Sequence, residues 1–267
     1  MSTLTLPSRP LFERWNRFQS RLRFKYILPR VRMGRLAGIK LDLAGLSPLM
    51  KNIILTGRYE AQERKLAAMA LKQDDVVLEL GGAIGFIGLY CRKVLGVKHV
   101  TSVEANPATL RILRRNYQLN GLTPHVIHGA AAGEDGELDL NIGGEFWENT
   151  LTGSSTDTVR VPSLSLDSLV RQMPHAPTVL ICDIEGAEQY LDFRQLPPSV
   201  TRIIIELHPS MIGQDRVDAI LRDLAQLGFT DRRTEDGTSL LETPGRLPSR
   251  TFPALPVTIK ETVVPVK

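Results

Sequence analysis

From about residue 59 onward, the chain alternates short apolar, β-rich runs with amphipathic stretches, and this alternation constrains its fold more than any other feature. Strands joined by helices in this order form a parallel sheet with helices packed against it. The runs are nearly all apolar, as strands covered on both faces require. The five predicted parallel strands are residues 76–80, 99–104, 125–130, 178–184 and 202–207. The sequence therefore predicts an α/β fold.

Two regions depart from this alternation. Residues 137–162 contain two β-rich segments around a polar, glycine-rich stretch, which indicates a β-hairpin or lid-like insertion and a natural place for substrate contacts. Residues 229–242 are typical of a closing antiparallel pair of strands. Added to the five parallel strands, this pair predicts a mostly parallel seven-stranded sheet with helices on both faces.

The two ends of the chain differ from its middle. Residues 1–40 contain ten Lys or Arg and a single acid, Glu13, although the whole chain has a net charge of only +4. We interpret residues 1–57 as a basic, helical N-terminal arm. Residues 244–267 contain five prolines and are expected to form an extended tail, which could pack on the body or on a second subunit. The main domain is then predicted at residues 58–243.

The arm allows two interpretations. Phe12, Trp15 and Phe18 lie among several arginines, so the arm could lie on an anionic membrane surface or bind an acidic partner. Alternatively, it is a helix that docks its aromatic side on the domain and leaves its arginines in solvent. Nucleic acid is not an expected partner, because the basic charge is confined to the arm and no known reader motif accompanies it.

The remaining composition indicates a cytoplasmic protein. The chain has no apolar run of about eighteen residues that would span a bilayer, and its first residues lack the apolar stretch of a secretory signal. Cys91 and Cys182 fall in a predicted helix and a predicted strand. They are interpreted as small buried hydrophobic residues and not as a disulfide or a metal cluster.

The segment VLELGGAIG, residues 77–85, joins the first predicted strand to the helix that follows. A strand end and a helix N-terminus face a ligand crevice at such a junction. Gly81 and Gly85 allow a tight turn and a close approach to a ligand, and Glu79 can accept hydrogen bonds from an ammonium group or a water. Ala83 stands where a dinucleotide fold needs the second glycine of Gly-x-Gly-x-x-Gly, which speaks against a pyrophosphate.

A second acid lies at the end of the next predicted strand. Glu104 is in position to bind both hydroxyls of a ribose, as acids at that strand end do in nucleotide folds. Either Glu79 or Glu104 alone could be a solvated strand end. Together with the glycines between them and the strand-turn-helix context, they predict a site for a nucleoside cofactor.

Further motifs between residues 58 and 208 carry a resemblance to a known family. The most specific is DIEGAE at residues 183–188, with Leu166-Asp167 upstream and Glu206-Leu207-His208 downstream. With the glycine motif, they resemble the FkbM family of S-adenosylmethionine-dependent methyltransferases over a little more than half of the chain. Glu79 departs from the family pattern, which usually has Asp there. The resemblance implies a Rossmann-like class I methyltransferase fold and S-adenosylmethionine as cofactor.

The resemblance also implies a set of cofactor-binding residues at the strand ends and in nearby loops: Tyr59, Glu60, Glu79, Gly81, Gly85, Glu104, Ala105, Asn106, Ala130 and Asp183. The glycine motif would hold the methionine part, Glu104 the ribose, and Ala130 would border the adenine. Tyr59 and Glu60 would close the pocket, although a Tyr-Glu pair at a helix start is also an ordinary cap and packing unit.

The reacting end of the site is predicted at the ends of the fourth and fifth parallel strands. Asp183, Glu206 and His208 converge there if these strands are neighbours. One of them is the candidate catalytic base, and the unperturbed pKa of a histidine suits this task. The same three residues could bind Mg²⁺ or another divalent ion that lowers the pKa of a hydroxyl. Alternatively, Asp183 orders its loop, Glu185 and Glu188 cap the next helix, and His208 is a structural histidine.

These observations predict a methyltransferase that acts on the hydroxyl of a small molecule, a sugar or a lipid head group. Hydroxyl acceptors follow from the family resemblance, and no Asn-Pro-Pro-Tyr motif for amide nitrogen is present. A nicotinamide-dependent oxidoreductase is the alternative enzyme, and the glycine spacing speaks against it. A cofactor-binding module without catalysis is the alternative outside enzymes, and the intact acids and histidine speak against that.

Overall fold

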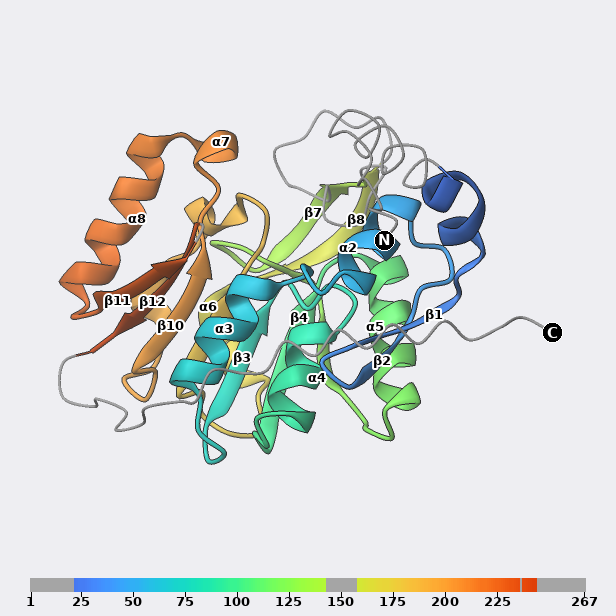
Figure 1. Cartoon of the computed structure of the whole chain (residues 1–267). Helices are drawn as coiled ribbons and strands as arrows, with labels where there is room; N and C mark the ends of the chain where they lie inside the picture. Colours follow the sequence, from blue (N-terminus) through green and yellow to red (C-terminus); the bar gives the residue numbers. More distant parts are fainter. Residues whose placement is uncertain (1–21, 143–157, 236, 244–267) are drawn as a thin grey trace, which may run out of the picture.

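The computed structural model of the chain describes residues 22–142, 158–235 and 237–243 (Figure 1). Most of the expected aromatic stretch of the arm, the middle of the expected insertion and the proline-rich tail lie outside these residues. No helix within the described residues is both long and apolar enough to cross a membrane.

The main sheet has the strand order β11-β12-β10-β9-β3-β4-β5 within the described chain. The parallel strands are β3 (Val76–Leu80), β4 (His99–Glu104), β5 (His125–His128), β9 (Val179–Cys182) and β10 (Arg202–Glu206). β11 (Thr230–Glu235) and β12 (Thr238–Glu242) add an antiparallel pair beside β10. The chain proceeds outward from β3 in one direction and from β9 in the other, so the strand order reverses between these two neighbours. The predicted α/β fold is confirmed.

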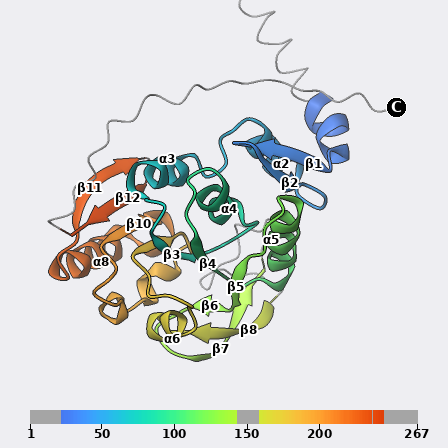
Figure 2. The same cartoon turned by 90° about the horizontal axis from the view of Figure 1, so that it is seen from below.

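Helices cover both faces of this sheet (Figure 2). α3 (Ala61–Ala70), α4 (Phe86–Lys93) and α5 (Pro107–Leu119) contribute to the hydrophobic core on one face. α6 (Leu166–Arg171) and α8 (Gln214–Gln226) contribute to the core on the other. Every residue of β9 is buried, as its all-apolar sequence predicts.

Local signals in the sequence set the helix starts beside the sheet. α5 begins with Pro107, and the side chain of Asn106 accepts a hydrogen bond of 2.8 Å from the Ala108 amide. α6 begins after Ser165, whose hydroxyl accepts from the Ser168 amide at 3.3 Å. Proline at the first turn and Ser or Asn at the cap satisfy amides that have no partner inside the helix.

A smaller sheet lies beside the β5 edge and corrects one expected strand. The expected run at 125–130 ends at His128, and Ala130–Ala131 forms β6 of a three-stranded sheet in the order β6-β8-β7. In this sheet β7 (Gly136–Asn141) pairs antiparallel with β8 (Thr158–Leu164). Gly129 permits the change of direction, since a Cβ there would lie 3.1 Å from the Pro162 carbonyl oxygen.

The expectation of a helical arm is wrong for part of residues 22–57. η1 (Arg23–Ile27) and η2 (Leu28–Arg30) are helical turns, but β1 (Met33–Leu36) and β2 (Ile39–Asp42) form an antiparallel hairpin. α2 (Pro48–Leu55) follows the hairpin. Apolar side chains of β2 and α2 belong to the same hydrophobic core as α3 to α5. The hairpin was missed because its strands are only four residues long and carry charged residues on their exposed side.

Candidate active site

A cavity of about 390 Å³ opens at the carboxyl ends of the central strands. Gly81, Glu104, Asp183 and Glu206 line it, and they follow or end β3, β4, β9 and β10. In doubly wound sheets, ligands bind at the carboxyl edge where the strand order reverses, and the cavity lies at this point. Further lining residues come from α2, α3 and the small sheet: Met50, Ile53, Tyr59, Glu60, Glu63, Ala130 and Leu140.

The two glycines of the motif after β3 have different roles. Gly81 lines the cavity with a φ of +84°, and a Cβ on it would lie 1.8 Å from the carbonyl oxygen of Asp183. Gly85 has a φ of +80° and does not line the cavity; a Cβ there would collide with Leu113. The predicted tight turn is therefore present. Gly81 allows the loops after β3 and β9 to meet at the cavity, whereas Gly85 lets α5 pack against the loop.

Glu79 lies beneath the cavity and does not line it. Its side chain is buried, accepts a hydrogen bond of 3.0 Å from the Gly88 amide, and accepts a second from the hydroxyl of Ser102. Burial raises its pKa to about 7, against the effect of these two hydrogen bonds. The arrangement shows Glu79 joining β3 to β4 and α4, while a contact with the methionine part of a cofactor stays a prediction.

Glu104 lines the cavity at the end of β4, where the sequence predicted it. One carboxylate oxygen accepts from the Ala83 amide and the other from the Asn106 amide, both at 2.8 Å. Burial raises its pKa to about 7, and the backbone hydrogen bonds oppose that rise. Ala105 and Ala130 also line the cavity, whereas Asn106 is buried as the cap of α5.

Tyr59 and Glu60 line the cavity at the start of α3. Tyr59 is buried, and its ring packs 5.7 Å from that of Phe86. Burial raises the pKa of both side chains, and they are hydrogen-bonded to each other. Glu60 holds a left-handed backbone, with a φ of +47°, which is uncommon outside glycine. The packing interpretation therefore holds for Tyr59, whereas Glu60 stands at the cap position of α3 without capping it through its side chain; both residues also line the cavity.

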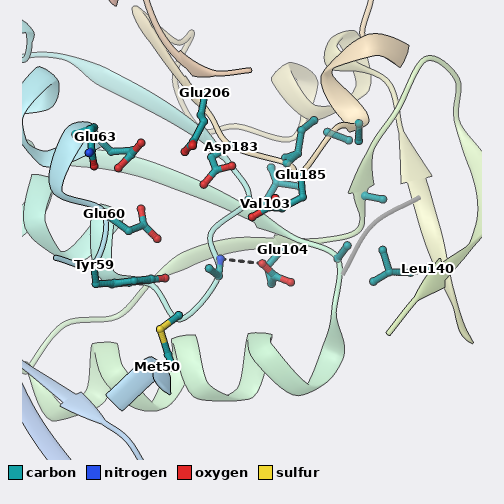
Figure 3. Close-up of a pocket in the computed structure, with 18 of the residues that line it drawn as sticks. Met50, Tyr59, Glu60, Glu63, Val103, Glu104, Leu140, Asp183, Glu185 and Glu206 are labelled. Atoms are coloured by element: carbon teal, nitrogen blue, oxygen red, sulfur yellow. Dashed lines mark hydrogen bonds between the residues drawn. The ribbon is translucent and has the colours of Figure 1, made fainter. Parts of the chain in front are cut away.

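Carboxyl groups gather at one side of the cavity (Figure 3). Glu60, Glu63, Asp183 and Glu206 point toward one another there, and Leu140 lies on the opposite side. Glu63 was not predicted: it is buried, and its Oε1 accepts a 2.7 Å hydrogen bond from the Thr238 hydroxyl. Glu63 lies in the first turn of α3, whereas Glu60 precedes this helix with a left-handed backbone, so helical spacing from Glu60 gave no signal for Glu63.

Burial raises the pKa of two acids at these strand ends. The pKa of Asp183 rises to about 7, with a further contribution from Glu185 and an opposing one from His208. The pKa of Glu206 rises to about 8, mainly through burial and then through the charges of Asp183 and Glu63. Asp183 Oδ1 is buried, and no hydrogen-bond partner for it occurs among the described residues.

His208 lies behind the acids and does not line the cavity. Its Nδ1 is 3.2 Å from Glu188 Oε1, and its Nε2 is 3.3 Å from Glu185 Oε2 and 3.6 Å from Asp183 Oδ1. Burial alone would lower its pKa, but the hydrogen bond to Glu188 and the surrounding charges raise it to about 9. The sequence predicted an unperturbed pKa for His208, and the structure raises it. With a pKa of about 9, His208 is protonated near neutral pH, and its charge attracts the surrounding carboxylates.

The predicted divalent-ion group is only partly assembled. Asp183, Glu188 and His208 each offer a ligand atom, and these atoms lie within 4.8 Å of one another. The sequence predicted Glu206 as the third candidate ligand, but Glu188 completes the group instead. Glu206 Oε1 is 3.9 Å from His208 Nε2. Glu188 is fully buried, and its Oε2 has no hydrogen-bond partner among the described residues. A bound ion stays a prediction.

A family match assigns the chain to a class of methyltransferases. A family model described as the methyltransferase FkbM domain matches residues 79–230, which is more than half of the chain. The chain belongs to this family, which confirms the resemblance that its sequence motifs indicated. A search of curated proteins gave no significant match.

Solved structures similar to this chain include a methylase, a methyltransferase and a protein solved with AdoMet. The ribosomal protein L11 methylase from Lactobacillus delbrueckii subsp. bulgaricus has 15% identity and a TM-score of 0.45, with 75% of this chain and 80% of that chain covered. A methyltransferase from Pyrococcus furiosus has 15% identity and a TM-score of 0.42, with 86% of this chain and 99% of that chain covered. M. jannaschii TYW2, solved with AdoMet, has 15% identity and a TM-score of 0.42, with 78% of this chain and 82% of that chain covered. Because these values are low, the fold assignment depends on the strand order and the family match.

Proposed function

We propose that the protein transfers a methyl group from S-adenosylmethionine to a hydroxyl oxygen. The observation that carries the proposal is the cavity itself, which joins Glu104 and the Gly81 loop to the acids that follow β9 and β10. The first group suits a nucleoside, and the second suits proton removal from an acceptor. A cavity that combines both is what methyl transfer from a nucleoside cofactor to a hydroxyl requires.

The residues of the cavity fit this cofactor. Each oxygen of Glu104 holds one amide and can accept a second hydrogen bond, as a ribose diol requires. Val103, Ala105, Ala130 and Leu140 supply apolar lining suited to an adenine. The carboxylates at the other side suit the positive charges of a sulfonium and an ammonium. The cofactor supplies a methyl group on a positively charged sulfur, which makes that methyl carbon electrophilic.

Asp183 is the proposed base. It lines the cavity, and its buried Oδ1 has no competing hydrogen bond in the described chain. It accepts the proton that the acceptor hydroxyl loses as its oxygen becomes methylated. Glu206 also lines the cavity and orients the acceptor, while His208 holds Asp183 and Glu185 in place from behind. Of the three candidate bases, His208 is the least suited, because its pKa is raised to about 9 and a protonated imidazole cannot accept a proton.

The acceptor is proposed to carry hydroxyl groups and no strong negative charge. Glu60, Glu63, Asp183, Glu185 and Glu206 all line the cavity; those that are ionised would repel an anionic group, and burying such a group among them would raise their pKa values further. Sugar and alcohol hydroxyls donate hydrogen bonds to carboxylates and meet no such penalty. A small molecule, a glycan or a neutral part of a lipid head group fits this requirement.

Two measurements test the proposal. Thermal-shift titration should show that S-adenosylmethionine raises the melting temperature and that NADH or NADPH does not, which separates a methyltransferase from an oxidoreductase. Labelled methyl from the cofactor should then appear in hydroxylated compounds of a cell extract. Binding without any methyl transfer would instead favour a module that has lost catalysis.

A further inference from the structure

Exposed apolar side chains concentrate near the N-terminal end of the described chain. Of the nine large hydrophobic residues that are exposed among the described residues, five lie between residues 22 and 49: Leu22, Tyr26, Ile27, Met33 and Leu49. Their elements are neighbours, because η1 and β1 both contact α2. In both views α2 lies on the same side of the sheet as the hairpin of β1 and β2, away from α8 (Figures 1 and 2). Water-exposed apolar groups gathered in this way mark an interaction surface more often than scattered ones do.

The same segment is uniformly basic. Residues 22–41 contain six Lys or Arg and no acid, and Asp42 is the first acid after them. Lys25, Arg30, Arg32, Arg35 and Lys40 are exposed. Lys51 of α2 is buried and donates to the Pro29 carbonyl, so it belongs to the fold and not to the surface. We call these five exposed basic and five exposed apolar residues the basic apolar face.

We propose that the basic apolar face binds an anionic membrane surface. Basic groups are attracted to anionic lipid, and apolar side chains between them enter the boundary between head groups and acyl chains. A nucleic acid would use the charge but would leave Ile27, Met33 and Leu49 in water. An anionic surface with an apolar layer beneath it satisfies both kinds of residue.

The face lies beside the cavity, on another side of the same helix. Met50 and Ile53 of α2 line the cavity, whereas Leu49 of α2 is exposed on the face. Membrane binding would therefore hold the cavity near the lipid surface. This part of the inference depends on the proposed function, and it narrows the acceptor to a hydroxyl carried on a lipid head group.

Sedimentation with vesicles tests the proposal without any cofactor. The full chain should sediment with phosphatidylcholine vesicles that contain about one third phosphatidylglycerol, and not with phosphatidylcholine alone. Binding should fall steeply between about 0.1 and about 1 M salt, because the Debye length shortens from about 10 to about 3 Å. The variant Arg32→Gln/Arg35→Gln should bind about 30-fold more weakly, since each basic group near such a surface accounts for about fivefold.

Matched variants separate the face from general charge and general hydrophobicity. Arg216→Gln/Arg222→Gln removes two exposed arginines of α8 at the far end of the molecule and should bind normally. Ile27→Ser/Met33→Ser should weaken binding at least tenfold, while Val94→Ser/Leu227→Ser should not. Circular dichroism confirms that each variant is folded.

Several outcomes would overturn the proposal. One is absence of sedimentation with anionic vesicles at low salt. Another is equal weakening by the α8 variant, which would indicate nonspecific charge attraction. Binding to RNA oligonucleotides without binding to vesicles would assign the face to nucleic acid. A dimer in analytical ultracentrifugation that dissociates in the Ile27→Ser/Met33→Ser variant, with no vesicle binding, would assign it to a second copy of the chain. Failure of methyl transfer would leave the vesicle result unaffected.

Discussion

Glu104 ends β4 in the proposed cofactor site, and its two carboxylate oxygens hold two neighbouring segments. One holds the Ala83 amide of the glycine loop, and the other holds the Asn106 amide at the start of α5. We expect Glu104→Gln to weaken S-adenosylmethionine binding by about 1 to 3 kcal/mol, because the new amide group turns one acceptor into a donor facing an N–H. Calorimetry measures the affinity, with the exposed Glu134→Gln as control. Unchanged affinity would refute the ribose assignment.

Asp183 is expected to act in catalysis and not in stability. Asp183→Asn keeps its size and removes one charge from a group of buried acids, so the melting temperature should stay the same or rise. Turnover should fall by about 10²-fold or more, the usual effect of losing a positioned base. Asp167→Asn, an exposed acid on α6, is the control. A loss of stability as large as the loss of activity would indicate a structural role.

The pH dependence of the same variant pair gives a second measurement of this prediction. A base works only when deprotonated, and burial raises the pKa of Asp183 to about 7. The value of kcat/KM should therefore rise about tenfold per pH unit below pH 7 and level off above it. Asp183→Asn should lose this step. A profile that keeps rising to about pH 9 would assign the base to His208 instead.

Metal removal tests the predicted divalent ion separately. If Asp183, Glu188 and His208 hold an ion, chelation should abolish turnover, added Mg²⁺ or Mn²⁺ should restore it, and His208→Gln should lose Mn²⁺ binding in electron paramagnetic resonance. Full activity in chelator, with no bound Mn²⁺, would contradict a metal role and leave Asp183 as an unassisted base.

Strand-end acids were predictable from sequence, and acids contributed by helices were not. Glu104, Asp183 and Glu206 all line the cavity, because an apolar run followed by an acid fixes both the strand and its end. Glu63 was missed because its inward direction depends on how α3 packs on the sheet. Glu79 and His208 lie at predicted strand ends but outside the cavity lining, since the strand pattern does not determine which neighbour a side chain contacts.

At the level of the elements, a buried ion pair joins α3 to the sheet. The guanidinium of Arg202 on β10 donates to Asp75 Oδ1 at 2.5 Å and Oδ2 at 2.8 Å, and also to the Ala70 carbonyl at the end of α3. Asp75 further accepts from the Thr178 hydroxyl before β9 at 2.9 Å. The ion pair therefore holds together the amino ends of β3, β9 and β10. Asp183 and Glu206 lie at the carboxyl ends of β9 and β10.

We expect Asp75→Ala to destabilise the protein by about 3 to 5 kcal/mol, because it leaves a buried guanidinium without its counterion. Denaturant unfolding measures the change. Asp167→Asn breaks an exposed pair with Arg171 and should cost less than about 1 kcal/mol. Equal effects of the two variants would show that the buried pair has no special importance.

The sequence predicted long elements well and short ones poorly. β3, β4 and β10 lie within a few residues of their expected positions, because each is rich in β-branched or other apolar residues and ends on an acid or next to one. The expected strand at 125–130 continued past its true end, since Gly129 and Ala130 look like strand residues until β8 is known to pair with Ala130. A partner more than thirty residues away in the chain gives no local signal.

Across the whole molecule, the N-terminal hairpin is part of the catalytic core. Asn120 of α5 accepts from the Lys40 amide at 3.0 Å and donates to its carbonyl at 2.7 Å. Asn116 accepts from the Asp42 amide at 2.7 Å and donates to the Ile84 carbonyl in the glycine loop at 2.8 Å. One buried asparagine therefore links the hairpin to the cofactor loop, which a domain boundary placed at residue 57 did not foresee.

This connection predicts that hairpin mutations act on global stability. Leu41 is fully buried on β2 and belongs to the core that also contains Leu89 and Leu113. We expect Leu41→Ala to lower the free energy of unfolding by about 2 to 5 kcal/mol through the cavity it leaves. Hydrogen exchange measures this, and the slowest amides of β9 and β10 should accelerate by the same free energy, since they open only on global unfolding. Val94→Ala, at an exposed apolar site, should leave these amides unchanged. Acceleration confined to residues 33–55 would instead show that the hairpin unfolds as a separate arm.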